Sequence, residues 1–358
     1  MAQSLKYAAL LTVLSLPLMA SPHFCKAQPA PTGVAQQPSN PPAEEEKPVK
    51  VFTEEILLPV LASDERGRFD PGLTVDDVLI LEEGVPQQVR SVRLLPVNLL
   101  LLIDLGGEVP SPLKTTCELI ANPSVAPAFS TCVIAQQFID ALGDGDGVAV
   151  LQNSGRVEVL QDWTTKRAEA ALKVRTRLFS SARSRLAECL SRAAEMVARR
   201  PAGNTHIVII TSGAEGGGLS ADSSHLTRRL AATQATLHVI SYSAILLESL
   251  SNRNFGLDFQ MRRRYQRYGE AIKQAEVRLQ MMVREIGGEM FSPADEEEVA
   301  RQSRAVVNNI KLQYVITYKP ARPFGTEGAS ERRRVAVGAR RVGLRLVSLR
   351  DYVTLVRP

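Results

Sequence analysis

Apolar runs alternate with amphipathic stretches through the middle of the chain. Val97 to Asp104, His206 to Thr211 and Leu237 to Tyr242 are almost continuous apolar segments of strand length. Such runs are typical of strands that are buried on both faces of a parallel sheet. The stretches between them, such as Arg185 to Arg200, have the apolar spacing of helices. This alternation predicts a doubly wound, mostly parallel α/β sheet over residues 96–310.

Shorter strand patterns flank this central part on both sides. Residues 50–95 contain Ile56 to Ala62, Val78 to Glu82 and the alternating run Gln88 to Leu94, separated by turn residues. Residues 311–358 contain four more runs of this kind. Because the strands of residues 50–95 are too few for a closed sandwich, we expect the two flanks to combine. They predict a small antiparallel, sandwich-like β domain into which the α/β domain is inserted.

The N-terminus has the pattern of an export signal. Lys6 precedes an apolar run from Tyr7 to Ala20, which is shorter than the ~20 residues that cross a bilayer. We interpret residues 1–27 as a signal peptide cleaved after Ala27, with cleavage after Ala20 as the alternative. Residues 28–49 are rich in proline and polar residues and predict an extended linker. The mature protein would then be exported, either periplasmic or secreted, without a transmembrane segment.

Composition and charge narrow the classes of function. A hydrophobic fraction of 44% and a charged fraction of 23% are those of a folded protein, which excludes disorder throughout the chain. The formal net charge is +5. Removal of residues 1–27 takes away two lysines and no acid, leaving 41 basic and 38 acidic residues and a formal charge of +3. So small an excess does not predict a nucleic-acid partner.

The order of several sequence blocks resembles a known family. A turn-bearing β segment (SDERGRFDPGLTVDDVLILEEGVPQQVRSV) precedes VNLLLLIDLGG, GVAVLQNSGRVEVLQDWT, THIVIITSG and LQYVITYKP, and RDYVTL follows. Over residues 51–358 this order resembles bacterial von Willebrand factor type A (vWA)-related proteins of the type best represented in Acidobacteria. The resemblance implies a Rossmann-like vWA domain that binds proteins or other ligands, in many relatives with Mg²⁺ at the top of the sheet. It implies no catalytic chemistry.

The metal site that the resemblance implies is altered in three loops. Similar domains carry Asp-x-Ser-x-Ser after the first strand, whereas Asp104 is followed here by Leu-Gly-Gly-Glu. The loop that supplies a threonine has Ser180 and Ser181 beside Arg183, and the usual Thr-Asp-Gly is replaced by a segment with Ser212. We therefore predict a degenerate metal-ion-dependent adhesion site that works without a cofactor. If Mg²⁺ binds at all, we expect Asp104, Glu108 and Ser212 to hold it.

The same edge of the sheet is the predicted ligand face, because open α/β sheets bind ligands at the carboxyl ends of their strands. Asp104 has an alternative role there as a group that holds loops together by hydrogen bonds. The remaining members of the face come from the loops named above. The predicted face consists of Asp104, Gly106, Glu108, Ser180, Ser181, Ser212 and Glu215.

Enzymatic activity is not predicted. The chain has no Gly-x-Ser-x-Gly elbow for a nucleophilic serine, and the glycines from Gly213 to Gly218 lack the lysine of a phosphate-binding loop. His206 and His238 lie inside apolar strand runs, where a structural role is expected rather than a catalytic one. No catalytic residue is therefore assigned.

Two further groups of residues complete the sequence-based picture. Cys117 and Cys132 flank a loop on the ligand face, and in an exported protein they predict a disulfide, with unpaired thiols as the alternative. Cys189 predicts a buried thiol. Basic residues form two clusters, one of which interleaves tyrosines and is a candidate anion-binding site. This cluster contains Arg262, Arg263, Arg264 and Arg267, and the other contains Arg332 to Arg334 with Arg340 and Arg341.

The predicted function is that of an exported, non-enzymatic vWA-type protein that binds a protein partner in the cell envelope or outside the cell. The partner would dock at the carboxyl edge of the parallel strands. The alternative is a structural module of the cell envelope whose arginine clusters bind an anionic polymer or a lipid surface.

Overall fold

The computed structural model describes residues 55–107, 130–201, 203–213, 223–253, 258–324 and 330–356. The predicted signal peptide and the linker lie outside these residues. Within the described part of the chain, no helix is both long enough and apolar enough to cross a membrane.

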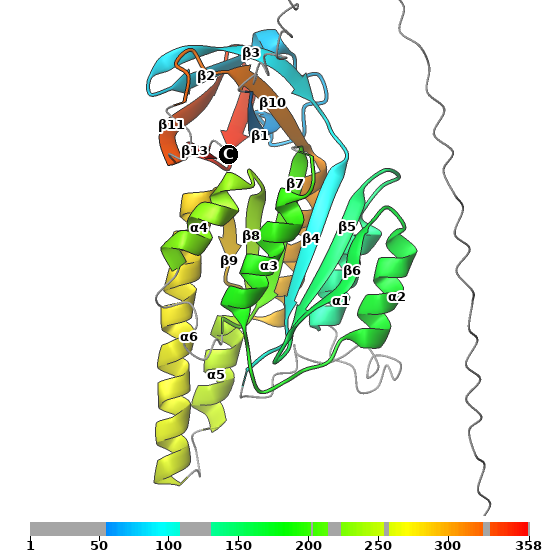
Figure 1. Ribbon diagram of the computed structural model, residues 1–358, viewed down its shortest axis with the longest axis vertical. Coiled ribbons are helices and arrows are strands. Elements are labelled where there is room, and N and C mark those ends of the chain that lie inside the picture. The colour runs from blue at the N-terminus through cyan, green and yellow to red at the C-terminus, as the bar shows by residue number, and fades with distance from the viewer. Residues whose placement is uncertain are drawn as a thin grey trace, which may run out of the picture. The chain divides into compact units, whose positions relative to one another are not determined.

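A six-stranded sheet forms the centre of the α/β part (Figure 1). Its strand order is β6-β5-β4-β7-β8-β9, with all neighbours parallel except the antiparallel edge strand β6. In chain order this is 3-2-1-4-5-6, the order of doubly wound folds. The predicted mostly parallel sheet is therefore confirmed. The strands are β4 (Val97–Asp104), β5 (Gly147–Asn153), β6 (Val157–Thr164), β7 (Asn204–Thr211), β8 (Thr236–Ser241) and β9 (Gly288–Phe291).

Helices cover both faces of this sheet because alternate residues of its strands point to opposite sides. On β4, Leu99 and Leu101 pack with helices α1, α2 and α7, whereas Leu100 and Leu102 pack with α3, α4 and α6. Helix α5 packs on α6 through a smaller cluster. The helices are α1 (Thr131–Asp140), α2 (Arg167–Arg177), α3 (Leu186–Ala198), α4 (Ser223–Ala232), α5 (Ser243–Arg253), α6 (Phe259–Ile286) and α7 (Glu296–Lys311).

Strands from both flanks of the α/β part form a second sheet of seven antiparallel strands, with the order β12-β1-β10-β3-β2-β11-β13. The flanking segments thus combine as the sequence indicates, but as one curled sheet rather than as two facing sheets (Figure 1). The single sheet arises because β3 pairs with both β10 and β2. Its elements are β1 (Ile56–Asp64), the short helix η1 (Val75–Asp77), β2 (Val78–Glu82), β3 (Val85–Arg93), β10 (Gln313–Lys319), β11 (Ser330–Ala339), β12 (Leu344–Ser348) and β13 (Tyr352–Val356).

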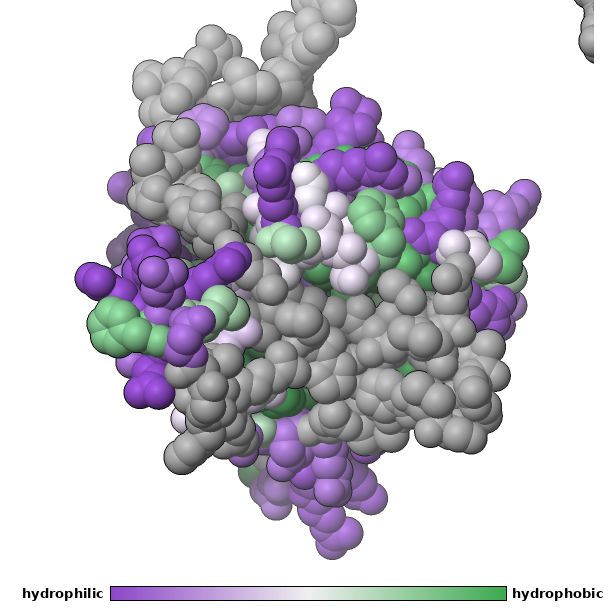
Figure 2. Space-filling view, turned by 90° about the horizontal axis from the view of Figure 1, so that it is seen from below, coloured by the Kyte–Doolittle hydropathy of each residue, from purple (hydrophilic) through white to green (hydrophobic). Residues whose placement is uncertain are grey.

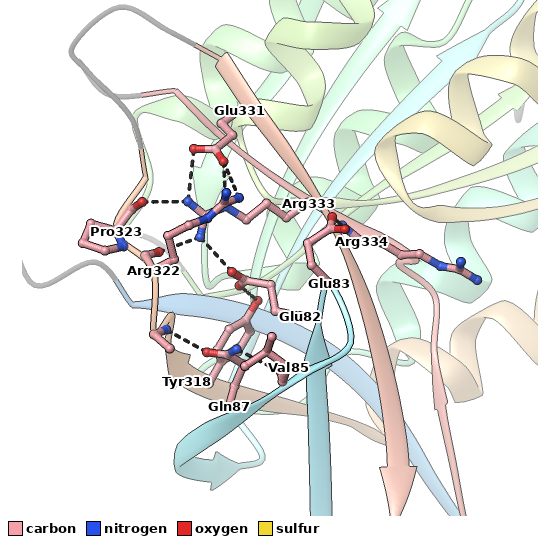
Figure 3. A network of polar contacts seen from close by, with 11 residues as sticks. Glu82, Glu83, Val85, Gln87, Tyr318, Arg322, Pro323, Glu331, Arg333 and Arg334 are labelled. Atoms are coloured by element: carbon pink, nitrogen blue, oxygen red, sulfur yellow. Dashed lines mark hydrogen bonds and ion pairs between the residues drawn. The ribbon is translucent and has the colours of Figure 1, made fainter.

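A buried ionic network joins the strands of this sheet (Figure 3). The Arg333 side chain is 1% exposed, and its guanidinium contacts Glu82 Oε1 at 2.7 Å and Glu331 Oε1 at 2.9 Å. It also donates to the carbonyl oxygens of Arg322 and Pro323. The Tyr318 hydroxyl donates to the second Glu82 oxygen at 2.8 Å. The guanidinium also stacks on the ring of Phe324, 3.7 Å from its centroid. The carboxylates and carbonyl oxygens therefore compensate the buried charge.

The basic segment from Arg332 to Arg334 is therefore not uniformly exposed to solvent. Arg333 is inside the sheet, and Arg332 stacks over the ring of Tyr352. Arg341 is paired with Asp70 and Asp77. Strand alternation places the middle arginine on the buried face, and its carboxylate partners come from distant or neighbouring strand positions.

We expect the replacement Arg333→Met to lower the free energy of unfolding by about 3–5 kcal/mol, because it leaves the carboxylate of Glu82 buried without its partner. Arg334→Met is the matched control, since it removes an exposed arginine from the next position of β11. Urea unfolding of both variants measures the difference. Equal losses in the two variants would contradict a stabilising role of the network.

Two histidines form a hydrogen-bonded chain inside the six-stranded sheet. Asn204 Nδ2 donates to the Leu95 carbonyl oxygen, which directs its Oδ1 toward His206 Nε2 at 2.8 Å. His206 Nδ1 then lies 3.2 Å from His238 Nε2. This arrangement makes His206 the donor to Asn204 and His238 the donor to His206, with both rings neutral. Burial lowers the pKa of His238 to about 3, and burial, His238 and Arg350 lower that of His206.

The histidine pair makes stability depend on pH. Both rings are neutral in the folded protein, whereas both bind protons in the unfolded chain below their ordinary pKa of 6.5. The stabilisation is therefore complete above pH 6.5 and is lost as the pH falls toward the lowered pKa values. We expect a loss of up to about 1.4 kcal/mol per pH unit for each histidine. Urea unfolding between about pH 7 and pH 5 should show a shallower dependence in the double variant His206→Gln/His238→Gln; an unchanged slope would refute the assignment.

Candidate functional site

The carboxyl edge of the six-stranded sheet gathers polar residues from neighbouring strands. Strand β4 ends at Asp104, which lies in register with Asn153 at the end of β5. Strand β7 ends at Thr211, in register with Ser241 of β8. All four residues are fully buried. Because parallel strands end at one edge, residues more than a hundred positions apart in the sequence meet there.

Asp104 is the centre of this group. Its Oδ1 accepts hydrogen bonds from the Gly106 backbone N–H at 3.1 Å, from Asn153 Nδ2 at 2.9 Å and from Ser184 Oγ at 3.4 Å. Its Oδ2 accepts from Thr211 Oγ1 at 2.6 Å. Such donors are what a buried carboxylate requires, because an unpaired buried charge is strongly unfavourable. Asp104 therefore ties β4, β5, β7 and the loop before α3 together.

The loops above Asp104 are held by close backbone contacts. Gly106 forms an isolated parallel bridge with Ser181, and Gly107 N donates to the Ser181 carbonyl oxygen at 3.0 Å. A Cβ atom on Gly106 would lie 2.5 Å from the Arg183 carbonyl oxygen. No larger residue fits at this position without moving the loop. Gly106 is therefore required by the close approach of the neighbouring backbone.

Tyr242 is a further member of this polar group. Its hydroxyl donates to the Asp104 carbonyl oxygen at 3.0 Å. Burial and then the negative charge of Asp104 raise the pKa of Tyr242 well above its ordinary value, while hydrogen bonds with Ser212 and Thr131 lower it. The phenol therefore stays protonated and acts as a neutral donor. The Ser212 side chain is fully buried, inside the protein.

Protein donors surround Asp104 at the edge where similar folds hold a cation. A metal ion binds to lone pairs of carboxylate oxygens, and Asp104 Oδ1 already accepts three hydrogen bonds while Oδ2 accepts one from Thr211. No group of three or more histidine, cysteine or acidic side chains able to hold a metal ion occurs in the described ranges. Glu108 and Glu215, two of the acids predicted for this face, lie outside those ranges.

The predicted face residues that the structure describes differ in their exposure to solvent. Asp104, Gly106 and Ser212 are buried, Ser181 is half-buried and Ser180 is exposed. Arg183 is exposed next to them. The solvent-facing part of the described edge is therefore the loop of Ser180, Ser181 and Arg183, with Asp104 beneath it as its anchor.

Sequence reasoning missed four members of the polar group: Asn153, Ser184, Thr211 and Tyr242. Asn153 and Thr211 could have been predicted from the sequence, because each is the polar residue that ends a buried apolar strand. Ser184 and Tyr242 carry no local signal, since their partners are distant in the sequence.

The remaining predicted sites lie elsewhere. Cys132 is buried at the start of α1, and Cys117 lies outside the described residues, so their disulfide stays a prediction. Cys189 is fully buried in α3, as expected. Arg262, Arg263, Arg264 and Arg267 are all exposed in the first part of α6.

Similarity to known proteins lies at the level of solved structures. No family model matches the chain, and no curated protein does either. Among solved structures, a von Willebrand factor type A protein from Catenulispora acidiphila is 14% identical, with 81% of this chain and 75% of that chain covered and a TM-score of 0.44. The vWF domain of the type V pili tip protein Mfa5 from Porphyromonas gingivalis is 12% identical, with 61% and 97% covered and a TM-score of 0.36.

A third similar structure is the PilB minor pilin from Streptococcus sanguinis. It is 12% identical, with 62% of this chain and 62% of that chain covered and a TM-score of 0.39. The similar structures thus include vWA domains, the fold that the sequence blocks resemble.

We expect Thr211→Val to lower the free energy of unfolding by about 2–3 kcal/mol, because Asp104 loses a donor while it stays buried. The Gly213 N–H also loses its acceptor, Thr211 Oγ1, at 2.8 Å. Thr211→Ser is the control, since it keeps the hydroxyl and removes only a methyl group. Urea unfolding separates the two, and equal losses would show that packing rather than hydrogen bonding matters here.

Proposed function

We propose that this chain is a non-enzymatic vWA-type protein that binds a protein partner at the carboxyl edge of its parallel sheet, without a metal ion. The observation that carries the proposal is the internal engagement of Asp104. Its carboxylate is committed to four donors of the chain itself. The group that would recruit a cation in a related fold is used here to shape the loops that face outward.

A binding role is favoured over catalysis by the arrangement of titratable groups. His206 and His238 bond to each other and to Asn204 in the body of the sheet, so neither is available as a base for Ser180. The Ser212 side chain is fully buried and so does not face a substrate at the edge. A serine hydrolase requires a nucleophile and a base within hydrogen-bonding reach, and the described edge supplies no such pair.

The proposal extends to the organisation and location of the protein. We infer that residues 96–310 are a vWA domain inserted into a β domain made of residues 50–95 and 311–358. The pairing of β1 with β10 and of β2 with β11 supports this division. Export after cleavage of residues 1–27 and a disulfide between Cys117 and Cys132 are parts of the same proposal. The partner would then belong to the cell envelope or the extracellular space.

Capture of the partner from a cell-envelope extract tests the site and its metal independence together. We expect the immobilised protein to retain a partner in EDTA as well as in Mg²⁺, and Ser180→Arg to abolish retention by blocking the exposed loop. Gln88→Arg is the control, since it places the same side chain on an exposed position of β3. Equal retention by the two variants would exclude this edge, and retention only in Mg²⁺ would overturn the metal-free site.

A further inference from the structure

Helix α6 is longer than the sheet that it covers. It has 28 residues and spans about 42 Å, whereas the eight residues of β4 span about 26 Å. The helix ends at Ile286, directly before β9 begins at the amino edge of the sheet. Its first ten residues, about 15 Å of helix, therefore extend past the carboxyl edge, as Figure 1 shows.

Burial along α6 confirms where this projection begins. The buried positions of the helix start at Gly269 and continue to Ile286, and residues 259–268 contribute none. We call residues 259–268 the α6 tip. On one side, Tyr265 and Tyr268 pack against the cluster of Leu246, Leu250 and Ile272 that joins α5 to α6. The other side of the tip faces solvent.

The solvent-facing side carries a stripe of one aromatic ring and two arginines. Phe259, Arg263 and Arg267 are spaced four residues apart, which aligns them on one face of the helix over about 12 Å. Phe259 is 77% exposed, and both arginines are exposed. Neither Arg263 nor Arg267 has an ion pair or a hydrogen bond within the described part of the chain. Figure 2, which views the molecule from this end, shows strongly hydrophilic residues gathered around the tip at the left.

The tip concentrates positive charge near the amino end of α6. It contains Arg262, Arg263, Arg264 and Arg267 and no acidic residue. The acid next to it is the N-cap Asp258, whose carboxylate accepts a hydrogen bond from the Met261 backbone N–H at 2.8 Å. The exposed guanidinium groups of Arg263 and Arg267 attract anions.

We propose that the stripe of Phe259, Arg263 and Arg267 on the α6 tip binds an anionic phospholipid surface. The guanidinium groups contact the headgroup phosphates, and the ring of Phe259 enters the boundary of the acyl chains. Arginine is suited to this role because its planar donors match phosphate oxygens. The contact goes beyond the proposed partner site, since the stripe belongs to α6 and shares no residue with the loop of Ser180, Ser181 and Arg183.

The shape of the tip favours a lipid surface over an acidic protein. Binding hot spots between proteins generally place aromatic and arginine anchors in pockets of the partner and in well-packed interfaces. The stripe is instead convex, straight and at the end of a projecting helix, with its one large apolar side chain almost fully exposed. An apolar residue beside basic residues on one helix face is the pattern of an interfacial membrane contact.

Sedimentation with lipid vesicles tests this proposal on the full chain. Vesicles of phosphatidylcholine are compared with vesicles in which about one-third of the lipid is phosphatidylglycerol. We expect binding only to the anionic vesicles, with strong weakening at about 1 M salt, where charges are screened beyond about 3 Å. Arg263→Gln/Arg267→Gln should weaken binding by about 30-fold, since each basic residue near an anionic surface contributes about a fivefold gain.

Two further variants make the result specific to the stripe. Phe259→Ser should weaken binding by about tenfold through lost apolar insertion. Arg90→Gln/Arg93→Gln removes the same charge from exposed positions of β3 and should leave binding unchanged. Equal loss in the β3 variant, or equal binding to both kinds of vesicle, would overturn the proposal. Complete competition by soluble polyglutamate, with Phe259→Ser silent, would overturn it in favour of an acidic polymer.

Discussion

The buried carboxylate of Asp104 is the interaction on which the carboxyl edge depends. A lone carboxylate in this position would cost several kcal/mol, and the chain avoids that cost only by bringing four donors to it from neighbouring strands and loops. The same bonds fix the loop that begins at Gly106, where a Cβ would meet the Arg183 carbonyl oxygen. One charged group therefore sets both the registry of strand ends and the shape of the surface above them.

A second buried charge has the corresponding role in the seven-stranded sheet. Arg333 of β11 pairs with Glu82 of β2, which lies 251 positions earlier in the chain. A hydrophobic residue in place of either would pack in more than one register of the two strands. An ion pair with fixed geometry forms in only one register. Whether buried ion pairs stabilise a fold depends on complete compensation, and here Tyr318, Glu331 and two carbonyl oxygens supply it. The flanks of the α/β part are thus joined at a specific point.

Hydrophobic periodicity was sufficient for most of the secondary structure and for the strand classes. The strand predicted from Val97 to Asp104 has those bounds, because a run buried on both faces leaves no ambiguity of period. The four-residue strand β9 and helix α5 were missed, since a short half-buried strand has no distinct period. At the edge, Asp104 was identifiable by its place after an apolar strand. Its partners Ser184 and Tyr242 were not, because a hydrogen bond between residues 80 or more positions apart leaves no local pattern.

Some charged side chains of the protein are buried and compensated, whereas others are exposed and unpaired. This difference indicates which surface is available for binding. Asp104 and Arg333 are compensated inside the fold, where they shape loops and fix register. Arg263 and Arg267 are exposed on a helix that extends past its sheet, and neither has an ion pair within the described ranges. Contacts inside the fold account for the first pair and not for the second, so the charge of the second pair is directed outward. It lies at the same end of the sheet as the loops that Asp104 organises, so contacts with a surface and with a partner would be made from one side of the molecule.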